Sequence, residues 1–295
     1  MSAYYTTADV AQLCAQEPVA LGVIGNPIAH SKSPQMQQSA LDADSRPYRY
    51  IRLLADTADG GFENLLRQLE ELNFIGVNVT VPFKKKALAA AREADALSTL
   101  CGAANTLKRH PEGGWTAINT DGPGFAAAIQ ELSGKSLCEL RVIILGACGG
   151  AGSALAAQCV LSECRALCLV NRPRPELQQM ASDLASRYTG ELSTCHFDSP
   201  ELRAAVAQAD LIVNATSLGL KEGDPLPLPP EWLNPGQMVY DIVTHDTPLR
   251  KAAAKRGCLT DNGLAMLLWQ GAYAYNYWFG NMPDIDCMRT ALQQA

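Results

Sequence analysis

Residues 141–174 read R-V-I-I-L-G-A-C-G-G-A-G-S-A-L-A-A-Q-C-V-L-S-E-C-R-A-L-C-L-V-N-R-P-R. An apolar, β-branched run at 142–145 enters a cluster of glycines, an alanine-rich helical pattern follows, and a second apolar run at 166–170 ends at Asn171 and Arg172. A strand, a glycine turn, a helix and a second strand in this order form the first unit of a dinucleotide-binding fold. The stretch therefore predicts a doubly wound, Rossmann-type α/β domain.

The glycines of this turn have separate tasks. One lets the chain reverse tightly, one lets backbone amides approach a pyrophosphate, and one lets the helix pack closely on the strand. The strict G-x-G-x-x-G spacing would begin at Ala147, so the first task falls either to Ala147 or to a glycine one residue earlier. The glycines of the turn predicted to bind the cofactor are Gly146, Gly149, Gly150 and Gly152.

The end of the second strand indicates which cofactor binds. An acidic residue there would accept a hydrogen bond from the ribose 2′-hydroxyl of NAD, and none is present. Asn171, Arg172 and Arg174 stand there instead, and guanidinium groups suit a 2′-phosphate. The predicted cofactor is NADP, with NAD as the alternative.

Length and composition describe an ordinary globular protein. The 295 residues are 47% hydrophobic, with 17 prolines and 23 glycines, and suffice for two domains. A net charge of −6 and no basic tract longer than residues 84–86 disfavour a nucleic-acid partner. No stretch resembles an export signal or a membrane span, and the ten cysteines form no compact framework, so we expect a cytoplasmic location without a membrane partner. The spacing of Cys159, Cys164 and Cys168 does not match a metal site.

The N-terminal region predicts a strand followed by a polar segment. Residues 20–24 read as a buried strand that ends in the turn at 25–27. Ser31 and Ser33 then alternate, so on an extended segment both hydroxyls would face one side and suit a polyhydroxylated ligand. The competing interpretation makes Ser33 the N-cap of a helix that begins at Pro34.

A lysine-rich corner follows the next strand. Residues 75–81 alternate as a strand, Pro82 breaks it, and a helix is predicted over 83–96. Three lysines in the first turn of a helix oppose its dipole, so stability does not explain them. Lys84 is nearest to the strand end and is the candidate general acid or base.

Polar residues also flank the later strands of the first half. Asn105 begins a strand, and Asp121 precedes a helix predicted from about Pro123, where the simplest function of Asp121 is to cap the helix. Neither residue alone indicates a reaction.

Taken together, several segments closely resemble the shikimate/quinate dehydrogenase family, in order and over almost the whole chain. They are G-V-I-G-N-P-I-A-H-S-K-S-P, N-V-T-V-P-F-K, G-A-A-N-T, N-T-D-G, N-R, N-A-T-S-L-G and G-L-A-M-L-L-W-Q-G-A. The resemblance implies two α/β domains. Residues 1–120 and 262–295 would form a substrate domain with a mixed sheet, residues 121–261 the NADP domain, and the active site would lie in the cleft between them.

The resemblance also implies an activity, which is reversible hydride transfer between shikimate and 3-dehydroshikimate in the chorismate pathway of aromatic amino acid biosynthesis. The protein would be a monomer or a homodimer acting on a small ring hydroxy acid. A ketone that accepts hydride develops negative charge on oxygen, which an ammonium group stabilises and protonates, and a nearby carboxylate favours the charged lysine.

The matching positions assign individual roles. Ser31 and Ser33 match the serines that bind the substrate carboxylate. Thr80, Asn105 and Gln270 match polar groups that line the ring, and Lys84 and Asp121 match the catalytic pair. Two further positions, Thr216 and Gly263, are assigned to the cofactor.

One segment departs from the family pattern D-x-V-Y-N-P-x-x-T-P-L. Residues 241–249 read D-I-V-T-H-D-T-P-L, with Thr244 at the place of the tyrosine. This departure motivates an alternative, in which the chain is a paralogue that uses quinate, aminoshikimate or a related ring acid, with either NADP or NAD as its cofactor. His245 is expected to be a solvent-facing loop residue. A nucleotide-binding protein without catalysis is a third hypothesis, against which the intact Lys84 and Asp121 argue.

Overall fold

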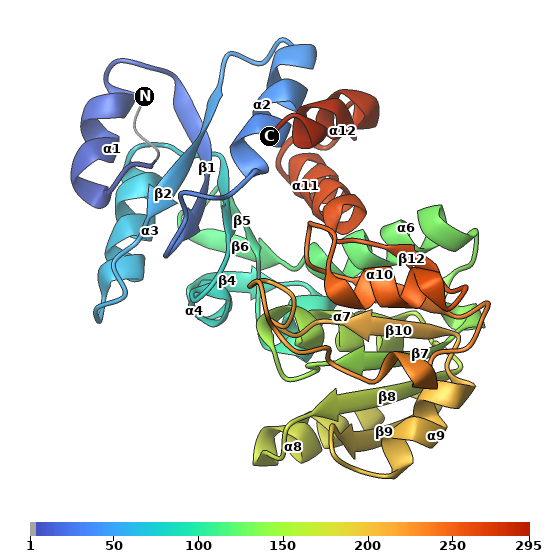
Figure 1. Cartoon of the computed structure of the whole chain (residues 1–295). Coiled ribbons are helices and arrows are strands. Elements are labelled where there is room, and N and C mark those ends of the chain that lie inside the picture. Colours follow the sequence, from blue (N-terminus) through green and yellow to red (C-terminus); the bar gives the residue numbers. More distant parts are fainter. Residues whose placement is uncertain (1–3) are drawn as a thin grey trace. The chain divides into compact units, whose positions relative to one another are not determined.

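The computed structural model describes residues 4–295, which form two compact units (Figure 1). Unit 1 comprises the chain up to Thr120 together with Leu268–Ala295, and unit 2 is Asp121–Leu267. Helix α11 (Leu264–Phe279) begins in unit 2 and continues in unit 1. Each unit has its own six-stranded sheet, and the predicted α/β class with one mixed and one Rossmann-type sheet is confirmed.

The sheet of unit 1 is mixed and has the order β2-β1-β3-β5-β6-β4. Its strands are β1 (Val19–Gly25), β2 (Arg49–Leu54), β3 (Gly76–Val79), β4 (Ala91–Ala94), β5 (Thr106–Arg109) and β6 (Trp115–Ile118). Strand β1 is parallel to β2 and β3, whereas β5 is antiparallel to β3 and β6. The other helices of this unit are α1 (Thr7–Cys14), α2 (Ser33–Ala43), α3 (Gly61–Glu71), α4 (Lys84–Ala89), α5 (Ala96–Cys101) and α12 (Ile285–Gln293).

The core of unit 1 fixes the corner that carries Lys84. Every residue of β1 is buried, as expected of a strand in the middle of a covered sheet. Helix α3 buries an apolar face, and the ring of its Phe62 stacks on Phe83 with centroids 5.0 Å apart. Since Phe83 directly precedes α4, this stacking anchors the start of the helix whose first residue is Lys84.

The sheet of unit 2 is parallel throughout and has the order β12-β11-β10-β7-β8-β9. Its strands are β7 (Arg141–Leu145), β8 (Ala166–Asn171), β9 (Glu191–His196), β10 (Leu211–Asn214), β11 (Met238–Asp241) and β12 (Leu259–Asp261). Its helices are α6 (Asp121–Ser133), α7 (Gly150–Leu161), α8 (Pro175–Ala185), α9 (Glu201–Gln208) and α10 (Pro248–Lys255), with short 3-10 helices at Leu137–Glu139 and Pro230–Trp232. The strand order reverses between β7 and β10, and ligands of such sheets bind at the carboxyl ends of the strands at this point.

The helix predicted over residues 83–96 is wrong. Helix α4 ends at Ala89, β4 occupies Ala91–Ala94, and α5 follows with its N-cap Asp95, whose Oδ1 accepts a hydrogen bond from the amide of Ser98 (2.8 Å). Strand β4 pairs with β6 and satisfies backbone groups that would otherwise be left open at the edge of the sheet. This long-range pairing outweighs the intrinsic helix propensity of an alanine-rich segment, which is worth only a few tenths of a kcal/mol per residue, roughly.

Candidate functional site

Unit 2 contains a cavity of about 600 Å³, a volume typical of ligand sites. Six of the residues predicted to bind the cofactor line it: Gly146, Gly149, Asn171, Arg172, Arg174 and Thr216. The remaining three predicted cofactor residues, Gly150, Gly152 and Gly263, do not belong to its lining. An apolar part of the wall is formed by Phe197, Leu226 and Pro227.

The turn between β7 and α7 shows which glycine reverses the chain. Gly146 has φ +84°, and a Cβ atom built on it would lie 2.9 Å from the carbonyl oxygen of Ala215. A residue with a side chain is strained there and has no room, so Gly146, not Ala147, performs the first task. Gly149 is the N-cap of α7, and Gly150 begins the helix. The amides of a first helical turn have no partner within the helix and are suited to binding an anion.

The other glycines outside the cavity lining contribute to packing. A Cβ atom on Gly152 would overlap the carbonyl oxygen of Gly146 and lie 3.0 Å from Cα of Ala147, so this glycine lets α7 approach the turn. Gly263 precedes α11, and a Cβ atom there would overlap the carbonyl oxygen of Ile242. Both positions therefore support the backbone around the cavity.

The basic part of the lining lies at the end of β8. Asn171 is buried, and its Nδ2 donates to the carbonyl oxygen of Arg172 (3.2 Å), while Arg172 and Arg174 are exposed. Burial raises the pKa of the Cys148 thiol in the glycine turn, and the positive charge of Arg174 partly offsets this effect. Arg174 lines the same cavity as Gly146 and Gly149 of the turn.

In unit 1, Ser31 and Ser33 lie at the start of α2. Ser33 is the first residue of the helix and Lys32 its N-cap, so neither the extended segment nor the N-cap at Ser33 that we predicted is present. The helix begins one residue earlier than predicted, and Pro34 still lies in its first turn, where its missing N–H leaves no helical hydrogen bond unmade. The two serines are nevertheless held together, since Oγ of Ser31 accepts from the amide of Ser33 (3.3 Å). The guanidinium of Arg52 donates to the carbonyl oxygen of Ser31 through Nε (3.0 Å) and Nη2 (2.6 Å).

Backbone hydrogen bonds bring Thr80, Lys84 and Asn105 into one region of unit 1. The amide of Thr80 donates to Ile24 at the end of β1 (2.8 Å), and its carbonyl oxygen accepts from Phe83 (2.9 Å). The carbonyl oxygen of Lys84 accepts from the amide of Ala104 (3.0 Å), the residue before Asn105. The strand end, the start of α4 and the start of β5 therefore converge.

Asn105 is held by a buried polar network. Its Oδ1 accepts from the amide of Thr120 (2.8 Å), the hydroxyl of Thr120 (3.1 Å) and the hydroxyl of Thr106 (3.1 Å). Asn78 supports this arrangement, because its Nδ2 donates to Oγ1 of Thr106 (3.0 Å) and its Oδ1 accepts from the hydroxyl of Tyr50 (2.7 Å). Burial raises the pKa of Tyr50 well above its usual value, so its hydroxyl stays a donor.

The sequence reasoning missed Asn78. The available signal was an amide in the middle of the apolar run V-N-V of a buried strand, where a polar side chain is tolerated only with hydrogen-bond partners. Its partners come from β2 and β5, which the linear sequence does not place beside it.

Gln270 and Asp121 lie on different helices. Gln270 is buried in α11, and the next residue, Gly271, accepts a hydrogen bond through its carbonyl oxygen from Gln37 of α2 (2.9 Å). Asp121 is buried and is the first residue of α6, so the predicted start at Pro123 with Asp121 as a preceding cap is wrong by two residues. The division into compact units places Lys84 in unit 1 and Asp121 in unit 2.

The segment that departs from the family pattern belongs to unit 2. His245 is exposed, as expected, and its Nε2 donates to the carbonyl oxygen of Gly219 (2.9 Å). Thr244 is half-buried beside it. This bond joins the two loops that follow β10 and β11.

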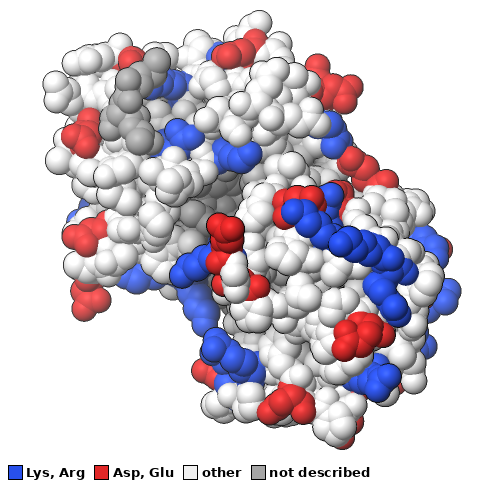
Figure 2. Space-filling view, viewed as in Figure 1, with Lys and Arg blue, Asp and Glu red and all other residues white. Residues whose placement is uncertain are grey.

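Acidic and basic side chains are interspersed over the face shown in Figure 2. Within residues 4–295, no helix has both the length and the apolar character needed to cross a membrane. Across the same residues, no three His, Cys, Asp or Glu side chains are grouped so that they could hold a metal ion.

The reversed strand order, the glycine turn at Gly146 and the cavity at the carboxyl ends of the strands define a two-unit α/β protein with a Rossmann-type domain, the architecture of nucleotide-dependent dehydrogenases. Two family models match the chain. The shikimate dehydrogenase substrate binding domain matches residues 23–107, and the shikimate 5′-dehydrogenase C-terminal domain matches residues 263–293.

Individual relatives extend the similarity over nearly the full length. The shikimate dehydrogenase (NADP(+)) of Symbiobacterium thermophilum is 36% identical over 280 residues, which cover 93% of this chain and 94% of the relative. The structure of shikimate 5-dehydrogenase from Listeria monocytogenes with shikimate and NAD has a TM-score of 0.84 at 29% identity and covers 93% of this chain and 96% of its own. The Thermus thermophilus enzyme in complex with NADP(H) and shikimate has a TM-score of 0.80 at 31% identity, with 94% and 99% covered. The chain belongs to the shikimate dehydrogenase family.

The network around Asn78 leads to a stability prediction. Replacing Asn78 with Ala leaves the buried hydroxyl of Tyr50 without its acceptor and that of Thr106 without one donor, so we expect the free energy of unfolding to fall by about 3 kcal/mol. Urea unfolding followed by circular dichroism measures this change. Asn64→Ala on the exposed side of α3 is the control, with an expected change within about 0.5 kcal/mol. Equal stability of the two variants would contradict the role given to the network.

Proposed function

We propose that this protein catalyses the reversible NADP-dependent oxidation of shikimate to 3-dehydroshikimate. The observation that carries the proposal is the 36% identity over 93% of the chain to a relative named shikimate dehydrogenase (NADP(+)). The sequence retains the predicted catalytic and substrate residues in their family contexts, including N-V-T-V-P-F-K around Lys84 and N-T-D-G around Asp121.

The cavity of unit 2 supports NADP as the cofactor. Arg172 and Arg174 are exposed at its edge, and the end of β8 carries no acidic residue that would favour a free 2′-hydroxyl. The first turn of α7, capped by Gly149, is suited to the pyrophosphate. When bound, NADP accepts the hydride that leaves the substrate or, as NADPH, supplies it.

The protein's own residues bind the ring acid and handle the proton. We assign the substrate carboxylate to Ser31 and Ser33, which the structure holds together at the start of α2. Thr80, Asn105 and Gln270 are assigned to the ring hydroxyls, and the buried network fixes the orientation of the Asn105 amide. Unit 1 is accordingly the substrate-binding part, and unit 2 the cofactor-binding part.

Lys84 and Asp121 are the proposed catalytic residues. In the direction of reduction, negative charge develops on the substrate oxygen, and the Lys84 ammonium stabilises that charge and donates the proton. In the direction of oxidation the same side chain takes the proton back. Asp121, as a carboxylate, accepts a hydrogen bond from the reacting hydroxyl of shikimate, and its negative charge favours the protonated form of Lys84.

The reaction belongs to the chorismate pathway of aromatic amino acid biosynthesis. Composition and charge support a cytoplasmic enzyme that has neither nucleic acid nor membrane as a partner. The resemblance to the family supports a small ring hydroxy acid as substrate and a monomer or homodimer as the active form.

The substrate and cofactor are tested together by initial rates. Shikimate and quinate are each assayed with NADP and with NAD, following cofactor reduction by absorbance. We expect the shikimate and NADP pair to give the highest kcat/KM, which would show that Thr244 is a tolerated replacement for the tyrosine of the family. A higher kcat/KM with quinate or with NAD would contradict the proposal.

Replacing Lys84 with Ala removes the proposed proton donor. We expect kcat to fall by about 10³-fold, because general acid–base catalysis contributes effects of this order. The Kd of NADP, measured by fluorescence titration, should stay within about twofold of the wild-type value. Lys85→Ala is the matched control, since Lys85 is the exposed neighbour in the same helical turn and should retain wild-type kcat. Undiminished turnover of Lys84→Ala would remove Lys84 from the mechanism.

The two arginines make a separate prediction about cofactor choice. Arg172→Ala and Arg174→Ala should each raise the KM of NADP about tenfold, since a charge-assisted hydrogen bond to a phosphate is lost. The KM of NAD, which lacks the 2′-phosphate, should change little. Arg187→Ala removes the same charge from an exposed position of unit 2 outside the cavity lining and serves as the control. A parallel increase for both cofactors would show that the arginines do not recognise the 2′-phosphate.

A further inference from the structure

Asp241 is a fully buried carboxylate at the carboxyl end of β11. Its Oδ1 accepts from Nδ2 of Asn214 (3.1 Å) and from the amide of Val243 (3.1 Å), and its Oδ2 accepts from the hydroxyl of Thr247 (2.7 Å). Burial of a carboxylate is costly, and such a group persists only where donors compensate it. All of these donors are neutral groups, so their geometry, rather than an opposite charge, retains Asp241 in the interior.

The carboxylate determines which way the Asn214 amide points. Asn214 and Asp241 are paired in register on the adjacent strands β10 and β11. An ionised carboxylate only accepts hydrogen bonds, so the amide must turn its NH₂ group toward Asp241 and its oxygen away. The oxygen thereby accepts from the amide of Thr216 (3.1 Å) and from its hydroxyl (2.7 Å).

The Asn214 side chain, oriented in this way, holds the loop that follows β10 in one conformation. Nδ2 of Asn214 donates not only to Asp241 but also to the carbonyl oxygen of Leu218 (3.1 Å), and Oγ1 of Thr216 accepts from the amide of Leu218 (3.1 Å). Four consecutive residues of this loop, 215–218, line the cavity of unit 2. One amide side chain therefore sets the shape of a continuous part of the wall.

The same loop lies against the glycine turn. A Cβ atom built on Gly146 would come within 2.9 Å of both Cγ2 of Thr216 and the carbonyl oxygen of Ala215. The loop therefore occupies the space that a side chain at position 146 would need, and the two backbones approach each other closely there.

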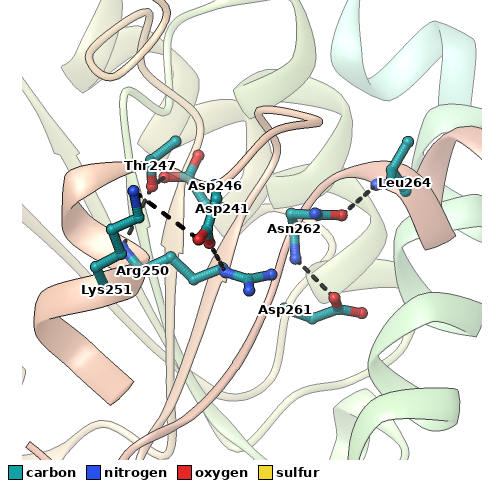
Figure 3. A network of polar contacts seen from close by, with 8 residues as sticks. All are labelled: Asp241, Asp246, Thr247, Arg250, Lys251, Asp261, Asn262 and Leu264. Atoms are coloured by element: carbon teal, nitrogen blue, oxygen red, sulfur yellow. Dashed lines mark hydrogen bonds and ion pairs between the residues drawn. The ribbon is translucent and has the colours of Figure 1, made fainter. Parts of the chain in front are cut away.

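On its other side, Asp241 is tied to the start of α10. Thr247 caps this helix, with Oγ1 accepting from the amide of Arg250 (3.2 Å) while its hydroxyl hydrogen is donated to Asp241 (Figure 3). The side chain of Arg250 pairs with Asp246 (2.7 Å). Thr247 thus links Asp241 to the helix, whereas Asn214 links it to the loop after β10.

We propose that Asp241 is a positioning residue for NADP binding, which acts by orienting Asn214 and thereby holding residues 215–218 against the glycine turn. The inference rests on the proposed function, because it concerns the cofactor of that reaction. The simpler interpretation is that Asp241 only stabilises the junction of β11 and α10. The two interpretations differ in whether cofactor affinity changes separately from stability and from substrate affinity.

The test is Asp241→Asn, which keeps the shape of the side chain but replaces one of its two acceptor oxygens with a donor, so that Asn214 and Thr247 can no longer both donate to it. At a temperature well below unfolding, we expect the Kd and KM of NADP to rise about tenfold while the KM of shikimate stays within about twofold. Asp210→Asn is the matched control, since Asp210 also accepts a hydrogen bond within unit 2, from the amide of Arg141 (2.8 Å), but lies outside the cavity lining. It should bind NADP like the wild type.

A second pair of variants covers the case in which Asp241→Asn does not fold. Thr247→Val removes the hydroxyl donor to Asp241 and should weaken NADP binding by about threefold or more, whereas Thr247→Ser keeps the donor and should restore the affinity. Wild-type NADP affinity in a folded Asp241→Asn or Thr247→Val variant, or an equal rise in the KM of both substrates, would overturn the inference. Failure of the wild-type protein itself to bind NADP would instead count against the proposed function.

Discussion

The backbone reversal at Gly146 is the constraint on which unit 2 depends. Its φ of +84° sends the chain from the end of β7 back into α7, and the space where a side chain would stand is filled by Ala215 and Thr216. Only glycine meets both conditions at low cost. The reversal brings the first turn of α7 to the carboxyl edge of the sheet, where β8 and β10 also end. The cavity, the arginines at the end of β8 and the loop after β10 are therefore grouped by one turn.

Unit 1 uses a different principle, which is a polar network inside an otherwise apolar sheet. Tyr50, Asn78 and Thr106 lie on β2, β3 and β5 of one sheet and are joined by hydrogen bonds through Asn78. Asn105 and Thr120 extend this hydrogen-bond network. A fully satisfied network is tolerated in a core and holds its members in one arrangement, whereas a partly satisfied one is destabilising. The orientation of Asn105, which is proposed to bind the substrate, therefore depends on the same hydrogen-bond network that stabilises the sheet.

Local patterns sufficed to predict the glycine turn, the strands around it and the α/β class, because these features are encoded in consecutive residues. Strand β4 was missed because its partner β6 lies more than twenty residues further along the chain, and the alanine-rich sequence between residues 87 and 97 favours a helix when considered alone. Asn78 and the pairing of Asn214 with Asp241 were missed for a related reason. Their roles depend on strand register, which no single segment specifies. Lys84 was a candidate from its place in the lysine-rich corner, whereas the roles of Asp121 and the substrate residues came from family motifs. All of these assignments remain predictions.

Unit 1 is built from two separated parts of the chain, with the whole of unit 2 between them. The later part is joined to the earlier one by hydrogen bonds. The indole N–H of Trp278 donates to the carbonyl oxygen of Leu107 (3.0 Å), and the side-chain amide of Gln37 donates to the carbonyl oxygen of Gly271 (2.9 Å). A ribosome adds residues in order, and domains fold as they emerge. The nascent protein therefore has a complete unit 2 while unit 1 still lacks α11 and α12. Between these two moments the apolar surface that later receives Trp278 is uncovered, and exposed apolar surface of this kind promotes aggregation during synthesis.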